Sequence, residues 1–113
     1  MATISTHVLD TARGLPAEGV PIMLEALGDD DWLRVGGGIT NADGRVTALL
    51  TEVENLDPGV YRVTFDTFAY YQRFKTRTFY PMVRIIFEVF ESETHYHVPL
   101  LLSPWGYSTY RGS

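Results

Sequence analysis

Two histidines near the end of the chain, His95 and His97, are the first residues whose type and spacing point to chemistry. On an extended strand, residues two apart share a face, so both imidazoles are expected to point the same way. Three interpretations are open: a zinc site that still needs a third ligand, ordinary hydrogen-bonded histidines, or a general acid or base. The spacing alone favours the ordinary hydrogen-bonded histidine, because that is the commoner role of this residue.

Two more candidates lie earlier in the chain. His7 is in the middle of the expected strand, in "STHVLD", and Arg45 directly follows the turn sequence "NADG". Asp-Gly supplies the positive φ that a chain reversal needs, so Arg45 is expected to begin a strand, from where its side chain can reach a ligand. The alternative for Arg45 is a solvated surface arginine, whose exposed ion pairs contribute only about 0–1 kcal/mol.

The last four residues form an unusual polar tail. Tyr110, Arg111, Gly112 and Ser113 offer a phenol, a guanidinium, a flexible glycine and a hydroxyl with a terminal carboxylate. Chain ends are usually disordered. Here the aromatic residues of the preceding "SPWGYSTY" are expected to anchor the tail.

Composition excludes several classes of protein. The net charge of −5, from 9 basic and 14 acidic residues, argues against a nucleic-acid binder, which needs a basic face. Cysteine is absent, which excludes disulfides, thiolate nucleophiles and Cys-type zinc sites. The N-terminal sequence lacks the features of a signal peptide, and no apolar run is long enough to span a bilayer. We therefore expect no membrane association and a cytoplasmic location.

The elements that must position these residues are mostly strands. Apolar residues alternate with period two between turn residues, which predicts an all-β, two-sheet sandwich of about eight strands in a single domain, residues 1–113. One short helix is expected at residues 67–75, with Thr67 as its N-cap. The strands are expected at residues 3–10, 20–27, 32–40, 45–50, 60–66, 83–90, 94–103 and 106–112.

Three local features follow from the same pattern. The glycines at 36–38 favour a β-bulge in their strand. The strands at 83–90 and 94–103 are expected to form a pair joined by "ESE". The sequence "VPLLLSPW" carries large apolar residues in a row, so both faces of that strand need cover. A subunit interface is expected on the outer face, and a covering loop is the alternative.

Three ordered motifs, "STHVLD", "TNADGR" and "HYHVPLLLSPWGYSTYRGS", resemble the hydroxyisourate hydrolases, which are relatives of transthyretin. The stretch "FYPMVRIIFEV" is similar to the family more loosely, and the terminal "YRGS" is the most diagnostic motif. The resemblance covers nearly the whole chain. It implies a transthyretin-like sandwich of two four-stranded sheets with one short helix. It also implies a homotetramer, a dimer of dimers whose active sites lie at the dimer–dimer interface.

The same resemblance implies a reaction. The family opens the six-membered ring of 5-hydroxyisourate by hydrolysis, giving 2-oxo-4-hydroxy-4-carboxy-5-ureidoimidazoline in urate degradation, with no metal and no organic cofactor. Matched motif by motif, the implied catalytic residues are His7, Arg45, His97 and Ser113, and the implied substrate contacts are His7, Arg45, Tyr110, Arg111 and Gly112.

The implied roles fit elementary chemistry. One of His7 and His97 is expected to take a proton from water and the other to orient water or substrate, and the residues do not say which. Arg45 is expected to bind the substrate and stabilise developing negative charge. Ser113 is expected to close the pocket, and His95 is assigned to structure because it shares the strand face of His97.

Two other functions are open on the sequence. One is a non-enzymatic small-molecule carrier of the transthyretin type, and the other is a monomeric sandwich module for adhesion or carbohydrate binding. A carrier channel has no need of two histidines, an arginine and a polar tail converging on it. We therefore expect the enzyme.

Overall fold

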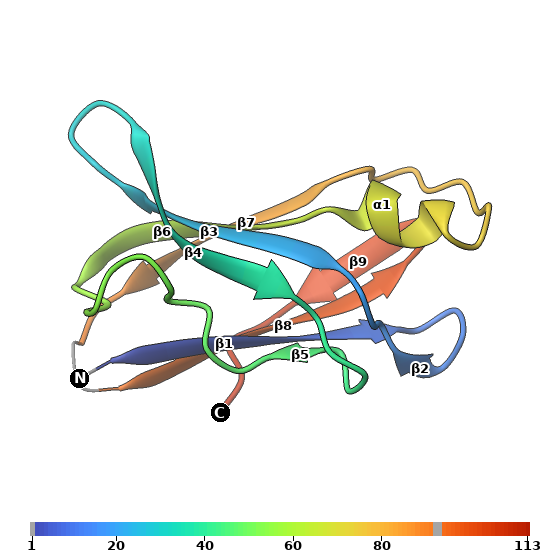
Figure 1. Ribbon diagram of the computed structural model, residues 1–113, viewed down its shortest axis with the longest axis horizontal. Helices are drawn as coiled ribbons and strands as arrows, with labels where there is room; N and C mark the ends of the chain where they lie inside the picture. The colour runs from blue at the N-terminus through green and yellow to red at the C-terminus, as the bar shows by residue number, and fades with distance from the viewer. Residues whose placement is uncertain (1, 92–93) are drawn as a thin grey trace.

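Two β-sheets packed face to face, with one short helix at one end, make up the fold (Figure 1). The structure is a computed structural model that describes residues 2–91 and 94–113. In chain order the elements are β1 (Thr3–Asp10), β2 (Leu15–Pro16), β3 (Pro21–Leu27), β4 (Trp32–Ile39), β5 (Arg45–Val46), β6 (Gly59–Phe65), α1 (Thr67–Gln72), β7 (Val83–Val89), β8 (His95–Ser103) and β9 (Gly106–Thr109). The all-β sandwich expected from the alternating sequence is confirmed.

The two sheets differ in how their strands are joined. The first sheet has the order β2-β1-β8-β9, with β5 also paired to β1, and the second has the order β4-β3-β6-β7. Neighbouring strands are antiparallel except β1 and β8, which run parallel. The implied four-stranded first sheet therefore has five strands. The reason is that the two-residue strands β2 and β5 pair with successive parts of β1.

The parallel β1–β8 pair decides which side chains face outward. Ile4, Val8 and Leu100 are no more than 1% exposed and point into the sandwich. Residues of the opposite parity face away from the second sheet, because side chains alternate along a strand. The outward row of β1 therefore lies beside the outward row of β8, where Ser5 is opposite His97. We call the outward side of β5, β1 and β8 the site face.

Core packing and a buried hydrogen bond connect the second sheet and the helix to the first sheet. Phe65 and Leu24 of the second sheet are fully buried, and side chains of this size stabilise by about 1.5–3 kcal/mol each. The phenol of Tyr70 on α1 donates a hydrogen bond to the buried carboxylate of Asp10 at the end of β1 (2.7 Å). The same carboxylate accepts hydrogen bonds from the backbone N–H groups that follow it. The polar group is thus satisfied inside the fold.

The strand expected at residues 45–50 ends at Val46, so the prediction is wrong for residues 47–50. Instead of extending β5, the chain crosses between the sheets: the N–H of Leu49 donates to Ile4 in β1, and the carbonyl of Leu49 accepts from Gly37 in β4. A Cβ on Gly36 would lie 1.7 Å from the Leu49 carbonyl oxygen, so this glycine is needed for the close approach. Leu49 itself is fully buried, and the core contact overrides the alternating pattern.

Three smaller expectations also need correction. The bulge falls at Val35, just before the glycines, because Leu24 pairs with Gly36 and the next residue pairs with Arg34. The helix N-cap is Asp66, whose carboxylate accepts the Ala69 N–H (3.0 Å), and not Thr67. The helix also ends at Gln72 rather than at residue 75.

The strands at 83–90 and 94–103 do not pair. β7 is an edge of the second sheet and β8 lies in the first, so the chain changes sheet between them. The connecting "ESE" lies partly outside the described residues, since Ser92 and Glu93 are not described. β9 ends at Thr109, three residues before the expected end, although Gly112 returns to pair with β8.

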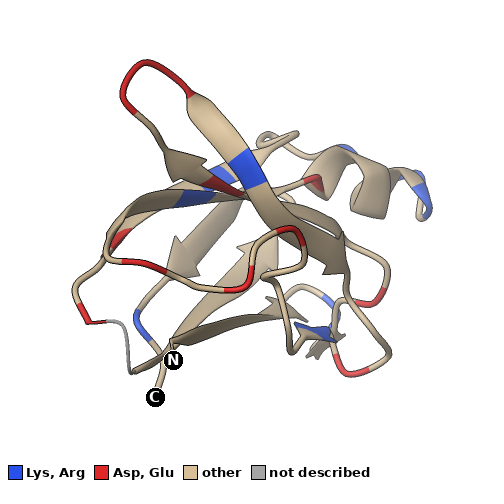
Figure 2. Ribbon diagram, turned by 60° about the vertical axis from the view of Figure 1, so that its left-hand side comes forward, with Lys and Arg blue, Asp and Glu red and all other residues tan. Residues whose placement is uncertain are grey.

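Charged residues are distributed along most of the chain (Figure 2). Acidic residues gather at the projecting tip of the β3–β4 hairpin, and the basic ones are dispersed along strands and near the end of the helix. Of the residues that the structure describes, no helix is long and apolar enough to cross a membrane.

Candidate active site

The site face brings three of the predicted residues together. His7 lies in the middle of β1, directly opposite Arg45 on β5 and Pro99 on β8. His97 lies one outward position before Pro99, opposite Ser5. Directly opposite side chains on paired strands are typically about 4.5–5.5 Å apart at Cβ. The two imidazoles and the guanidinium therefore share one patch, although they come from three strands.

The "NADG" turn holds Arg45 in this place. The side-chain oxygen of Asn41 accepts hydrogen bonds from the N–H groups of Asp43 (2.9 Å) and Arg45 (3.0 Å). Gly44 has φ +75°, which favours glycine. Its carbonyl accepts the Val8 N–H (2.7 Å), and a Cβ on it would lie 2.4 Å from the Val8 oxygen. The turn is thereby fastened to β1, which sets Arg45 opposite His7.

The surroundings of His97 keep its imidazole neutral. Burial lowers the pKa of His97, and the positive charge of Arg45 lowers it further, followed by smaller effects of His7 and His95. Backbone hydrogen bonding with Ser5 acts in the opposite direction. The pKa therefore lies below the ordinary value of 6.5, so His97 is neutral near pH 7 and has a lone pair available.

A hydroxyl that the sequence analysis missed joins the two C-terminal histidines. The Oγ of Ser5 is 2.8 Å from Nδ1 of His97 and 2.9 Å from Nε2 of His95. The two rings share a face, as expected, with centroids 6.4 Å apart and planes inclined by 20°. The sequence signal for Ser5 is weak: it has the same strand parity as His7, but only the β1–β8 pairing places it between the histidines.

The polar tail returns to the same strand. The N–H of Gly112 donates to the His97 carbonyl (2.8 Å). This contact keeps the register in which Leu100 is opposite Thr109. Between these pairs lies Pro99, which has no N–H to donate, and its carbonyl accepts the Thr109 hydroxyl instead (2.7 Å). The tail is thus an interrupted continuation of β9, and in Figures 1 and 2 the C-terminus lies on the side of the first sheet away from the second.

Within the single chain, the tail residues point in different directions. The guanidinium of Arg111 lies over the ring of Tyr96, 4.7 Å from its centroid, and Tyr96 is buried. Contacts of this kind stabilise by about 0.5–2 kcal/mol. Arg111 is therefore held on the ring and away from His7 and Arg45. Tyr110 and Ser113 are exposed.

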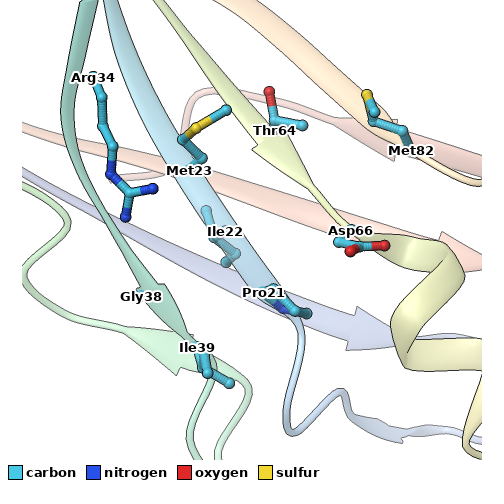
Figure 3. Close-up of a pocket in the computed structure, with 9 residues that line it drawn as sticks. All are labelled: Pro21, Ile22, Met23, Arg34, Gly38, Ile39, Thr64, Asp66 and Met82. Carbon is cyan, nitrogen blue, oxygen red and sulfur yellow. The ribbon is translucent and has the colours of Figure 1, made fainter.

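Two pockets show where a small molecule has room. One, of about 280 Å³, lies between β7 of the second sheet and β8 of the first: Ile85 and Phe87 line it together with His97 and the tail, and neither His7 nor Arg45 does. The other, of about 500 Å³, lies on the second sheet (Figure 3). It is mainly apolar and its charged side chains are Arg34 and Asp66. Neither pocket brings His7, Arg45 and His97 together, so we place the chemistry at the site face because these residues meet there, and not because of cavity volume.

The site shows no ready-made metal centre. Across residues 2–91 and 94–113, no group of three or more histidine, cysteine or carboxylate side chains is arranged to hold a metal ion. His95 and His97 instead direct ring nitrogens at the Ser5 hydroxyl. The arrangement suits proton transfer and the binding of a polar, planar molecule.

Comparisons with known proteins place the chain in a family. The profile of the HIUase/Transthyretin family matches residues 4–112. A 5-hydroxyisourate hydrolase from Salmonella dublin is 46% identical over 110 residues, which span 97% of this chain and 80% of the relative.

Two solved structures agree with this result. The 5-hydroxyisourate hydrolase of Klebsiella pneumoniae superposes with a TM-score of 0.85 at 38% identity, covering 100% of both chains. Sea bream transthyretin in complex with thyroxine superposes with a TM-score of 0.89 at 33% identity, covering 97% of this chain and 94% of that one. The transthyretin-like sandwich that the motifs implied is confirmed, and the chain belongs to the HIUase/Transthyretin family.

Proposed function

We propose that this protein hydrolyses 5-hydroxyisourate to 2-oxo-4-hydroxy-4-carboxy-5-ureidoimidazoline, a step of urate degradation. The observation that carries the proposal is the placement of His7, Arg45 and His97 on one outward patch, with the tail anchored on His97. The 46% identity to a hydrolase of that name supports this substrate. The reaction is the hydrolysis of a cyclic amide.

Water attacks the ring carbonyl carbon while a neutral imidazole accepts a proton from that water. His97 suits the role of base because its lowered pKa keeps it neutral at pH 7. His7 lies diagonally across from it and orients water or substrate. The carbonyl oxygen gains negative charge in the transition state, and the Arg45 guanidinium beside His7 stabilises that charge.

The tail completes the substrate pocket in this proposal. Gly112 lies against His97, and Tyr110 is exposed two residues before it. Ser113 closes the site with its hydroxyl. Arg111 belongs to the substrate contacts implied by the motif. In the single chain it rests on Tyr96, so it reaches substrate only by leaving that ring.

The proposal includes a homotetramer, a dimer of dimers, with the site face at the dimer–dimer interface. Leu101 on the outer side of β8 is partly exposed, and Trp105 in the following turn is 67% exposed. Apolar side chains in such positions suit a subunit contact better than water. A tetrameric mass in solution supports this arrangement, and a monomeric mass contradicts it. We also propose a cytoplasmic location, which fluorescence of a tagged protein in its own cells tests.

The second candidate is a carrier, because sea bream transthyretin, the structural neighbour, is solved with thyroxine. Two features favour the enzyme over the carrier: the neutral His97 and the opposed pair of His7 and Arg45. The deciding experiment follows the ultraviolet absorbance of freshly made 5-hydroxyisourate with and without protein. Faster decay that scales with protein concentration supports the hydrolase. An unchanged decay together with saturable thyroxine binding supports the carrier.

Gly112→Ala is expected to lower kcat/KM by about 10²-fold, because small displacements of catalytic groups have effects of this size. A Cβ at this position would lie 2.6 Å from Cδ2 of His97, so the tail or the imidazole must shift. The matched control is Gly106→Ala, where the nearest atom to a Cβ is the Ser103 hydroxyl oxygen at 3.8 Å. Equal activity of the two variants in the absorbance assay would show that the tail is not packed on His97 during catalysis.

A further inference from the structure

A continuous chain of hydrogen-bonding groups runs away from His97 along the site face. Nδ1 of His97 is 2.8 Å from the Ser5 hydroxyl, which is 2.9 Å from Nε2 of His95. Nδ1 of His95 is in turn 2.5 Å from the hydroxyl of Thr3. Two strands supply these groups alternately, because Thr3 is opposite His95 and Ser5 is opposite His97 in the parallel pair.

This series of hydrogen bonds leads from the partly buried ring of His97 to the exposed residues His95 and Thr3. Ser5 is only 8% exposed and His97 is partly buried, whereas His95 and Thr3 are exposed. In the tetramer proposed above, the inference requires that Thr3 and His95, at the starts of β1 and β8, lie outside the dimer–dimer contact, so that a proton that enters at His97 reaches water at that end of the path.

The chemistry of a hydroxyl allows only two directions for these bonds. Ser5 has one proton to donate, so it can donate to one ring nitrogen and must accept from the other. If Ser5 donates to His95, then Nδ1 of His97 carries a proton and its Nε2 has a free lone pair. If Ser5 donates to His97, then the His97 proton is on Nε2. The first direction gives a base at Nε2, and the second gives an acid there.

We propose that Ser5 is a positioning residue that sets the tautomer of His97 and, through His95, passes the proton released in each turnover to solvent. The inference rests on the proposed hydrolase function and extends it. It gives His95, which the motif comparison left as structural, a place in the proton path.

The proton balance of the reaction requires such an exit. Water supplies two protons: one ends on the nitrogen that leaves the broken C–N bond, and the other is released when the new carboxylic acid ionises. Nε2 of His97 takes the proton from the attacking water and gives it to the leaving nitrogen, so His97 is again neutral with its proton on Nδ1. When the new carboxylic acid ionises, Nε2 takes that proton, Nδ1–H passes its proton to Ser5, Ser5 passes its own to Nε2 of His95, and His95 releases one from Nδ1 to Thr3 or water. Both rings are then neutral with a proton on Nε2, and proton exchange with water at the two ends of the path restores the first direction after the product leaves.

The local charges favour movement in this direction. Burial lowers the pKa of His97, and the positive charge of Arg45 lowers it further. A proton is therefore less stable on His97 than on the same ring in water. His95 lies farther along the site face, at the exposed start of β8, where water can accept a proton.

Ser5→Ala and His95→Ala test the path in the absorbance assay. Each is expected to lower kcat about tenfold or more with KM within about twofold, which is a smaller loss than removing the base itself, at about 10²–10⁴-fold. The loss is expected to be reversed several-fold by high concentrations of imidazole buffer at constant pH and ionic strength. A small base from solution replaces the broken path, and a merely structural defect does not respond to it.

Ser5→Thr keeps the hydroxyl and is expected to retain most of kcat. Ser103→Ala is the matched control, because it removes a β8 hydroxyl that donates to Gly106 at the far end of the strand. The melting temperature of each variant separates misfolding from loss of the path. If Ser5→Ala and His95→Ala are folded and show wild-type kcat, or a lowered kcat that buffer does not change, the inference is wrong. If the wild-type protein itself does not accelerate substrate decay, the proposed function is wrong instead.

Discussion

Arg45→Ala is expected to lower kcat/KM for 5-hydroxyisourate by about 10²–10³-fold, the usual result of removing one group that stabilises a developing oxyanion. Arg45 is exposed and lies opposite His7, so its guanidinium can reach a substrate on the site face. Its backbone N–H is held by Asn41, and this contact does not depend on the side chain. The melting temperature is therefore expected to change by less than about 4 °C, because exposed substitutions alter stability by only about 0.5 kcal/mol.

The same variant has a second expected effect, on pH dependence. The positive charge of Arg45 lowers the pKa of His97, so removing it raises that pKa towards 6.5. The neutral base then appears only at higher pH, and the acidic limb of the kcat/KM profile is expected to move to higher pH. Arg84→Ala is the matched control, because Arg84 is exposed on the second sheet and donates to Thr64. A profile that does not move, or an Arg84→Ala variant as impaired as Arg45→Ala, would contradict the role given to Arg45.

His97→Ala is expected to lower kcat/KM by about 10²–10⁴-fold, the range for loss of a general base. In the wild-type protein, activity is expected to rise with pH as His97 loses its proton, at a pH below 6.5 because its pKa is lowered. Removal of His97 is expected to abolish this acidic limb as well as most of the rate. The measurement is kcat/KM from about pH 5 to pH 8, with the melting temperature recorded for each variant.

His7→Ala is the comparison that separates the two histidines. It is expected to impair turnover but to keep the acidic limb, because His97 still titrates. If His7→Ala loses the limb and His97→Ala retains it, the roles of base and orienting group are exchanged. If His97→Ala has normal specific activity but melts far below the wild-type protein, His97 is a structural residue.

Local sequence determined most of the strands and the turn that positions Arg45. The stretch around His7 is rich in β-branched residues and lacks Gly and Pro, and β1 (Thr3–Asp10) has the bounds expected for it. The turn before Arg45 was readable because Asn, Asp and Gly supply the hydrogen bonds and the positive φ that this turn contains. The sequence motifs also indicated the family, which the comparisons confirm.

Local sequence misled wherever a distant contact outweighed the alternating pattern. Residues 45–48 alternate between polar and apolar types like a strand, yet β5 ends at Val46, and Leu49 fills the core and forms backbone hydrogen bonds with both sheets. The two long strands near the C-terminus look like a hairpin, yet they lie in different sheets. In both cases the structure is decided by burial and by backbone pairing with remote segments. A short stretch of sequence contains no information about either of these long-range contacts.

For the candidate site, too, the sequence predicted one part and only the structure showed the other. Residue types and motifs were sufficient to nominate His7, Arg45, His97 and the tail. Only the tertiary structure placed Ser5 between two imidazoles from a strand about ninety positions later, since Ser5 and His97 are 92 residues apart. It alone also set Arg111 on Tyr96 and Gly112 against His97. The physical reason is that side-chain identity is local, whereas the pairing of β1 with β8 joins the two ends of the chain and exists only after folding.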